Sequence, residues 1–314
     1  MNWQTVVSEP SELGESPFWH PDEQMLYWVD IPGKLVNRLN IFMGTVQSWA
    51  MPSEPGCIAP ARTESLGGDV NGLIIALRDG IYRANEWGGA LQCLAKAEHD
   101  PATTRFNDGK ADPMGRFWAG SMYEPRTAKN AVLYSLDGRS STPTLQNRAG
   151  NATIANGLAW SPDSQTLYWT DTTSHTIRAW DWDATTGNMA NERIFKQWPG
   201  KPAGWAPGSK ESETTYGGRP DGAAVDVQGN YWVAMFEGGR VLQISPTGEV
   251  LADIAVPARC PTMPCFGGDD FKTLYITTAR HGRPAAELEL YPDSGCVFSM
   301  RVEVPGLAVN FFID

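Results

Sequence analysis

Short apolar segments separated by polar turns recur along the whole chain. In ANGLAWSPDSQTLYWTDT, residues 155–172, one apolar segment, a turn rich in Ser, Pro and Asp, and a second apolar segment follow one another. Short runs of aromatic and β-branched residues bounded by turn residues are typical of β-strands. The 3.6-residue period of amphipathic helices is weak throughout. The pattern therefore predicts an all-β protein.

A pair of large aromatic or aliphatic residues marks the second strand of each unit. It occurs six times, as Tyr27-Trp28, Ile74-Ile75, Phe117-Trp118, Tyr168-Trp169, Tyr231-Trp232 and Tyr275-Ile276. The second members of successive pairs are 47, 43, 51, 63 and 44 residues apart. A period of about 45 residues with strand signals is what a four-stranded propeller blade produces. We therefore expect residues 1–314 to form a single six-bladed β-propeller domain with four-stranded blades.

The interval of 63 residues contains an unusual segment. Residues 196–220, KQWPGKPAGWAPGSKESETTYGGRP, are rich in Gly, Pro and Ser and include Trp198, Trp205 and Tyr216. Long loops in compact folds are usually functional or disordered. The aromatic residues favour a functional loop, and we expect a long insertion at about 196–220 that forms a lid over a site.

Charge and cysteine content narrow the possible partners and location. The formal net charge of −11 argues against nucleic acid and anionic membranes as partners, because phosphates require a basic surface. The five cysteines are scattered, which is not a disulfide framework and favours a reducing compartment. The N-terminal MNWQTVVSEP has no secretory signal, and no apolar run has the length of a membrane span. We expect a cytoplasmic protein that acts on a small molecule; oligomeric state is not predicted.

Three oxygen-bearing side chains occupy one position of the repeat. Glu15 and Asn156 each lie 12 residues before the tyrosine of the pair, and Asp221 lies 10 before it because its turn is shorter. The innermost strands of a propeller line its channel, so these side chains should converge on the axis. Asn and Asp also favour turns and caps, which is the alternative interpretation. Their joint occurrence favours a divalent metal site, and an all-oxygen donor set suits Ca²⁺, Mg²⁺ or Mn²⁺ without excluding Zn²⁺ or Fe²⁺.

A fourth copy of the pattern supplies candidate substrate contacts. Asn107 lies 10 residues before Phe117, and Arg105 and Asp108 flank it. Glu124 follows the second strand of this unit. Arg105 could be a structural ion-pair partner, or it could bind substrate oxygens beside a metal.

Five segments resemble one known family in order and spacing. They are GESPFW, RFNDGKADPMGRFWAGSM, ANGLAWSPD, PDGAAVD and PTMPCFGGDDFKTLYITTA, spread over roughly residues 13–305. Together they resemble the regucalcin (senescence marker protein) and gluconolactonase family of six-bladed propellers. The resemblance implies metal ligation by Glu15, Asn156 and Asp221, and substrate contacts from Arg105, Asn107 and an acidic residue after the third-blade strand, here Glu124. The segment 196–220 is longer than is usual in that family.

The resemblance also implies an activity, the hydrolysis of sugar lactones. One divalent cation would polarise the lactone carbonyl, and Asp221 would serve as general base toward water. We therefore expect a carboxylic-ester hydrolase of the gluconolactonase type that converts an aldonolactone to the aldonic acid. The alternatives are hydrolysis of another ester or of a phosphotriester, and a non-catalytic calcium-binding propeller.

Overall fold

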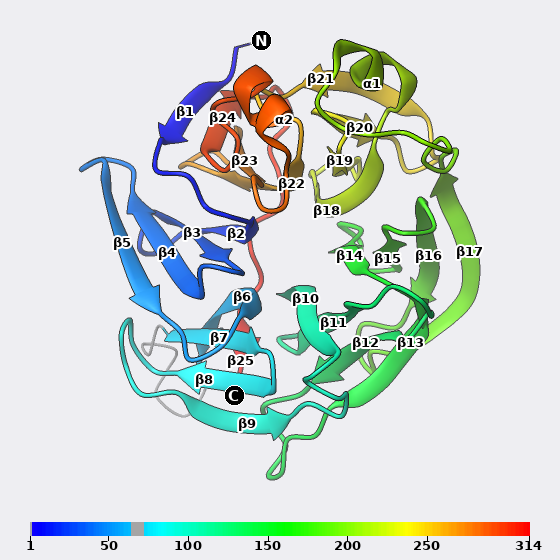
Figure 1. Ribbon diagram of the computed structural model, residues 1–314. Coiled ribbons are helices and arrows are strands. Elements are labelled where there is room, and N and C mark those ends of the chain that lie inside the picture. Colours follow the sequence, from blue (N-terminus) through cyan, green and yellow to red (C-terminus); the bar gives the residue numbers. More distant parts are fainter. Residues whose placement is uncertain (1, 64–71) are drawn as a thin grey trace.

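Six β-sheets are arranged in a ring around a central channel (Figure 1). The structure is a computed structural model that describes residues 2–63 and 72–314. The innermost strand of each sheet contacts the innermost strands of its two neighbours, which closes the ring. The six-bladed β-propeller predicted from the repeat is therefore confirmed.

The first three blades each contain four consecutive antiparallel strands, which run outward from the channel in chain order. Blade 1 consists of β2 (Gly14–His20), β3 (Met25–Asp30), β4 (Leu35–Asn40) and β5 (Thr45–Ala50). Blade 2 consists of β6 (Pro55–Arg62), β7 (Gly72–Leu77), β8 (Gly80–Ala84) and β9 (Gln92–Lys96). Blade 3 consists of β10 (Thr104–Ala111), β11 (Phe117–Tyr123), β12 (Ala131–Leu136) and β13 (Gln146–Ala152).

Blades 4 and 5 repeat this order, and blade 6 departs from it. Blade 4 consists of β14 (Ala155–Trp160), β15 (Thr166–Asp171), β16 (Thr176–Trp182) and β17 (Met189–Gln197). Blade 5 consists of β18 (Arg219–Val225), β19 (Tyr231–Phe236), β20 (Arg240–Ile244) and β21 (Val250–Ala255). Blade 6 consists of β22 (Pro261–Gly267), β23 (Thr273–Thr278), β24 (Val297–Arg301) and, outermost, β1 (Gln4–Val7) from the other end of the chain.

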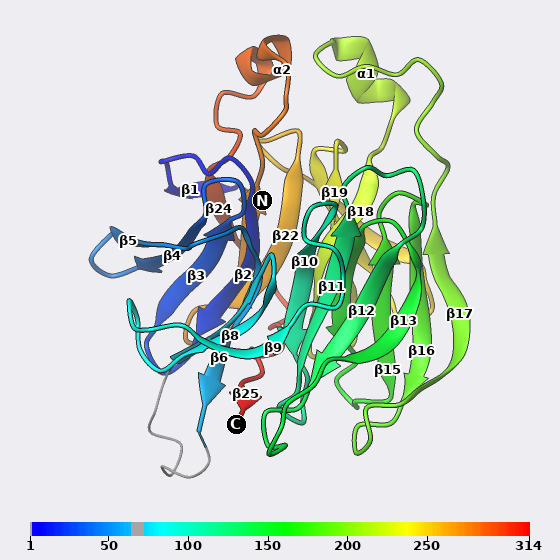
Figure 2. The same cartoon turned by 60° about the horizontal axis from the view of Figure 1, so that its bottom comes forward.

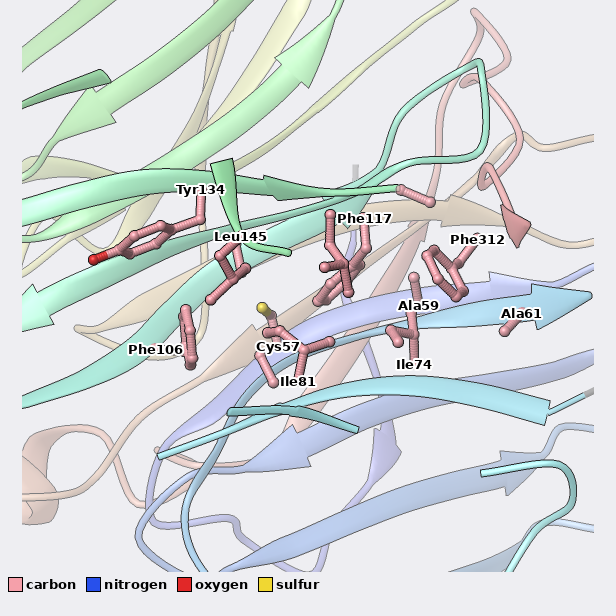
Figure 3. Close-up of a cluster of buried hydrophobic side chains, with 14 residues drawn as sticks. Cys57, Ala59, Ala61, Ile74, Ile81, Phe106, Phe117, Tyr134, Leu145 and Phe312 are labelled. Carbon is pink, nitrogen blue, oxygen red and sulfur yellow. The ribbon is translucent and has the colours of Figure 1, made fainter. Parts of the chain in front are cut away.

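Large side chains of the second strands fill the space between blades. All six residue pairs picked out by the repeat lie on second strands, and Trp28, Trp118 and Trp169 are among the largest fully buried side chains. Figure 3 shows the cluster between blades 2 and 3, where Phe106 and Phe117 meet residues of β6 and β7. The recurrent spacing of these pairs along the chain thus reflects the packing of successive sheets.

The C-terminal segment is built into the same ring. The short strand β25 (Phe312–Ile313) pairs in parallel with β6, with Phe312 opposite Ala61. Phe312 is fully buried in the cluster of Figure 3. Blade 2 therefore has a fifth strand, which the repeat pattern did not predict.

Two short helices rise from one end of the propeller, as Figure 2 shows. Helix α1 (Lys210–Thr215) lies between β17 and β18, and α2 (Ala285–Leu290) lies between β23 and β24. The predicted insertion therefore contains a helix. Ser209 is its N-cap residue and forms a capping box with Ser212. The flanking strands shorten the non-strand segment to residues 198–218.

Candidate active site

Four of the predicted residues lie at one level of the channel, on the innermost strands of four blades. Glu15 is on β2, Asn107 on β10, Asn156 on β14 and Asp221 on β18. Each lies in the first half of its strand, and the chain enters β18 from the side of α1, so the site faces the end that bears the helices (Figure 2). Each of the four side chains is at most 5% exposed.

A β-bulge at this level of each strand aims these side chains. The strand register shifts after Glu15 in blade 1 and after Asn156 in blade 4, and Asn107 and Asp221 are the first residues within the corresponding shifts. Bulges redirect side chains and are common next to active sites. The shift in blade 4 requires Gly157, which has φ 56°, and a Cβ at that position would collide with the Tyr231 hydroxyl. The same local interruption of strand pairing thus recurs at the site in blades 1, 3, 4 and 5.

A chain of hydrogen bonds fixes the amides of the site. Arg105 Nη1 donates to Asn107 Oδ1 (2.7 Å), and Asn107 Nδ2 donates to Asn156 Oδ1 (2.9 Å). Asn156 Nδ2 donates to Thr172 Oγ1 (2.8 Å), and that hydroxyl donates to the carbonyl oxygen of Pro220 (2.7 Å). Because an amide oxygen has two lone pairs, Asn156 Oδ1 can still accept one further partner.

Two buried carboxyl groups, Glu15 and Asp221, give the site its electrostatic character. Burial raises the pKa of Glu15 well above its usual range, and the charges of Asp221 and Asp108 raise it further. Burial also raises the pKa of Asp221 well above its usual range, against the opposing charge of Arg219. The desolvation and mutual repulsion of these groups are costs that a bound cation would relieve.

Asp108 adds a third buried carboxyl group, which the sequence interpretation named only as a neighbour of Asn107. Its Oδ2 accepts a hydrogen bond from the backbone N–H of Leu158 (3.0 Å). Its Oδ1 is buried and has no hydrogen-bond partner among the residues that the structure describes. Burial raises the pKa of this carboxyl, and the charge of Lys110 opposes the shift. This buried oxygen therefore keeps its capacity to accept a hydrogen bond or to ligate a cation.

These donors fit a hard divalent cation. Within residues 2–63 and 72–314, no three His, Cys, Asp or Glu side chains are arranged to hold a metal. A cation here would therefore need the amide oxygen of Asn156 together with the carboxylates of Glu15 and Asp221. Carboxylate and amide oxygens are ligands that Ca²⁺ and similar hard ions prefer.

Glu124 lies at the edge of the site and is held by another residue. Its two carboxylate oxygens accept hydrogen bonds from Arg78 Nη1 (2.9 Å) and Nη2 (3.1 Å), and Arg105 Nε lies 3.8 Å from Glu124 Oε1. The hydrogen bond from Arg78 is the main cause of the lowered pKa of Glu124. Arg78 also binds Glu54, so one guanidinium connects blades 2 and 3 beside Arg105. No local pattern around Arg78 could have indicated this role, because its partners are distant in the sequence.

Aromatic and polar contacts hold the segment 198–218 against the rim, by which we mean the loops at the end of the propeller that bears α1 and α2. The rings of Trp205 and Tyr216 pack edge-to-face with centroids 5.0 Å apart, and Tyr216 Oη lies 2.5 Å from His175 Nε2. Arg259 Nη2 donates to the carbonyl oxygen of Tyr216 (3.1 Å). Trp198 instead packs against the apolar cluster between blades 4 and 5. Two of the three aromatic residues thus belong to the rim, and the third belongs to blade packing.

A separate cavity of about 350 Å³ occupies the channel on the other side of the site. Its lining includes Ser16 of the blade 1 bulge and Lys110 of β10, but none of the four converging residues. Residues 307–310 of the C-terminal segment contribute to its wall. The cavity is therefore distinct from the face on which the helices lie.

Comparison with known proteins agrees with this architecture. Residues 13–280 match the model of the SMP-30/Gluconolactonase/LRE-like region. The chain is 41% identical over 98% of its length to 6-deoxy-6-sulfogluconolactonase of Pseudomonas putida, with 97% of that protein covered. It is 35% identical over 98% of its length to regucalcin of Danio rerio, with 95% of that protein covered.

A solved structure shows the same fold. The crystal structure of regucalcin from Agrobacterium tumefaciens, described as a calcium-binding protein, superposes with a TM-score of 0.86 at 24% identity, covering 99% of this chain and 97% of that one. The family model spans most of the chain, and both of the relatives named above exceed 30% identity over nearly all of it. The chain therefore belongs to the SMP-30/gluconolactonase/LRE-like family.

Proposed function

We propose that this protein is a metal-dependent lactonase that hydrolyses a sugar lactone to the corresponding aldonic acid. The observation that carries the proposal is the convergence of Glu15, Asn156 and Asp221 from three blades at one buried level of the channel. Membership of a gluconolactonase family, and a lactonase with 41% identity over nearly the whole chain, support a carboxylic-ester hydrolase.

Asp221 is the residue that we assign as general base. Its carboxyl is buried, and it is reached by a hydrogen bond from Asn156 and by the charge of Arg105. A base must be ionised to accept a proton from water, and burial alone disfavours that form. A divalent cation held by Glu15, Asn156 and Asp221 would supply Lewis-acid polarisation of the lactone carbonyl and would favour the ionised carboxylate. The candidate ions are Ca²⁺, Mg²⁺, Mn²⁺, Zn²⁺ and Fe²⁺.

Arg105 and Asn107 would orient the substrate. Arg105 is 7% exposed and already donates to Asn107 Oδ1 and to the carbonyl oxygen of Phe106. A guanidinium presents five N–H donors, so Arg105 retains donors for the oxygens of a sugar ring. Glu124, bound to Arg78, would set the position of Arg105 from the rim. Holding the ester in one orientation lowers the entropic part of the barrier.

The other predictions from the sequence concern organisation and location. We propose that the chain forms one domain and acts in the cytoplasm on a small molecule. In the part of the chain that the structure describes, no helix is long and apolar enough to cross a bilayer. All five cysteines have free thiols, as expected in a reducing compartment.

A hydrolysis panel tests the proposed function. The purified protein is supplied with each of the five divalent ions in turn and assayed against aldonolactones, aryl esters and a phosphotriester. We expect hydrolysis of at least one aldonolactone, accompanied by release of one acid equivalent per molecule. Activity confined to aryl esters or phosphotriesters would favour the alternative esterase function. Calcium binding without hydrolysis of any substrate would indicate a non-catalytic calcium-binding propeller.

A further inference from the structure

Five basic side chains gather on the rim at the end of the propeller where the site opens. We call them the cationic rim: Arg126, Lys201, Arg219, Arg259 and Arg283. They come from the connection after β11, the segment 198–218, the start of β18, the connection before β22 and the connection before α2. Such a concentration is unexpected on a chain with a formal net charge of −11.

The carboxylates of the rim do not balance these charges. Glu237 is shared by Lys201 Nζ (2.6 Å), Arg283 Nη1 (3.0 Å) and Arg219 Nη2 (3.6 Å). Glu287 forms an ion pair with Arg283, through Nε (2.7 Å). Two carboxylates thus serve three cations, which leaves one positive charge in excess.

Arg259 and Arg126, the other two members of the cationic rim, increase its excess of positive charge. Arg259 donates to the backbone carbonyl oxygens of Ser212 and Tyr216, which carry no net charge. No carboxylate among the described residues lies within ion-pair distance of Arg126. Glu124 is held by Arg78, and Glu213 bonds the same Tyr291 side chain as Arg259. Five cations thus face the three carboxylates Glu213, Glu237 and Glu287, which leaves the cationic rim with an excess of about two positive charges.

Arg126 and Arg219 are the pair most in need of an anion. Burial lowers the pKa of Arg126, and the positive charge of Arg219 lowers it further, so the two guanidinium groups repel each other. Arg219 Nε is buried and has no hydrogen-bond partner in the described part of the chain. Guanidinium groups recognise sulfonate and phosphate oxygens through charge-assisted hydrogen bonds. An anion between Arg126 and Arg219 would satisfy both.

The cationic rim lies next to the proposed catalytic base. Arg219 precedes Asp221 by two residues on β18, about 6–7 Å along an extended strand, and its charge acts on the Asp221 carboxyl. A six-carbon sugar lactone spans a comparable distance between its carbonyl and its terminal carbon. A lactone whose carbonyl faces Asp221 can therefore direct its far end toward Arg219.

We propose that the cationic rim binds a sulfonate or phosphate group on the substrate carbon farthest from the lactone carbonyl, so that the enzyme prefers anionic sugar lactones. This inference rests on the proposed lactonase function. The relative with 41% identity is itself named for a lactone that carries a sulfonate at carbon 6. The anionic group is unchanged by the reaction and serves only for recognition.

The test compares three substrates that share one lactone ring: glucono-δ-lactone, its 6-phosphate and its 6-deoxy-6-sulfo derivative. We expect kcat/KM for at least one anionic lactone to exceed that for the neutral lactone by about tenfold or more, since a hydrogen bond to a charged group contributes on that scale. The preferred anion distinguishes a sulfonate site from a phosphate site. Hydrolysis of all three lactones at similar rates would overturn the inference and leave the proposed function intact. Hydrolysis of none of them would also overturn the inference, and the proposed function would then be decided by the wider panel of aldonolactones.

Single substitutions test whether the preference for anionic lactones arises from the cationic rim. Arg126→Gln and Lys201→Gln should each lower the ratio of anionic to neutral kcat/KM about tenfold, mainly through KM. Arg193→Gln is the matched control, because Arg193 is an exposed arginine of the outer strand β17, paired with Asp181. It should leave the ratio unchanged. An equal loss in the control, or an unchanged ratio in both rim variants, would contradict the assignment.

Discussion

Burial of ionisable groups is what sets the candidate site apart at the scale of single residues. Glu15, Asp108 and Asp221 are each at most 5% exposed, and burial raises the pKa of all three carboxyl groups. Surface carboxylates such as Asp163 have a lowered pKa instead, because neighbouring hydroxyl and N–H groups stabilise the charge. Burying three carboxyl groups in one site costs stability, and a bound cation would offset that cost.

The burial of these carboxyl groups predicts the pH dependence of the metal-free protein. A carboxyl whose folded pKa lies above its unfolded value, about 4, keeps its proton in the folded state while the unfolded chain releases it. Stability is therefore lost as pH rises from about 4 toward the folded pKa. Asp221→Asn should thus raise the melting temperature in chelator at pH 7.5 by about 2–4 °C, with less effect at pH 4.5, while abolishing lactonase activity. Calorimetry at the two pH values measures the difference.

The control for that experiment is Glu303→Gln, which replaces an exposed carboxylate outside the site. It should shift neither melting temperature. A lower melting temperature for Asp221→Asn than for the wild type at both pH values would show that the carboxylate stabilises the metal-free fold, contrary to this prediction.

Site residues could be predicted from the sequence only where they occupy a position of the repeated pattern. Glu15, Asn156 and Asp221 could be selected because each stands at a fixed distance from a turn that recurs along the sequence. Arg78, which binds Glu124, has no such marker, since its partner lies 46 residues away on another blade. The lack of a hydrogen-bond partner at Asp108 Oδ1 in the described part of the chain depends on packing, which leaves no pattern in the sequence.

At the scale of elements, an aspartate in the turn between the first two strands binds the tryptophan of the second strand in blades 3 and 5. Trp118 Nε1 donates to Asp112 Oδ2 (2.8 Å) in blade 3, and Trp232 Nε1 donates to Asp226 Oδ2 (2.9 Å) in blade 5. Asp226 also accepts from the backbone N–H and the side chain of Asn230. The tryptophan of the repeated pair is thus both a packing residue and a donor that fixes the turn before it.

Removing this aspartate should destabilise blade 5 without touching the site. Asp226→Ala leaves the N–H groups of Trp232 and Asn230 buried without a partner, and each such group costs about 1–3 kcal/mol. We expect the free energy of unfolding to fall by about 2–4 kcal/mol, measured by urea denaturation, with kcat/KM of the folded protein little changed. Asp253→Ala, at an exposed ion pair on β21, should cost less than about 1 kcal/mol. Equal effects of the two substitutions would refute the role given to Asp226.

The elements that the repeat missed are those that join distant parts of the chain. The second strands could be located because each carries a large residue pair before a new turn. Strand β1 belongs to blade 6 only through its pairing with β24, and β25 belongs to blade 2 only through its pairing with β6. Strand β1 contains no such pair, and β25 consists of the pair Phe312 and Ile313 without being the second strand of a unit. Long-range pairing leaves no periodic signal in the sequence.

At the scale of the whole molecule, β1 closes the ring. Gln4 pairs with Ser299 and Thr5 with Phe298, so the two ends of the propeller sequence meet in one sheet. Deletion of residues 1–8 would leave β24 as an unpaired edge and remove the buried Val7. We expect a loss of about 2–4 kcal/mol in unfolding free energy and a tendency to self-associate through the exposed edge. Thermal unfolding and size-exclusion chromatography test this, and a monomer as stable as the intact chain would contradict it.

The central claim for the whole molecule is that side chains from three blades hold a cation on which lactone hydrolysis depends. Its most direct test is the initial rate of aldonolactone hydrolysis after exhaustive dialysis against a chelator, followed by titration with Ca²⁺, Mg²⁺, Mn²⁺, Zn²⁺ or Fe²⁺. We predict that the rate falls to that of the spontaneous reaction and is restored saturably by at least one ion. An undiminished rate in protein shown by elemental analysis to be free of metal would contradict the claim.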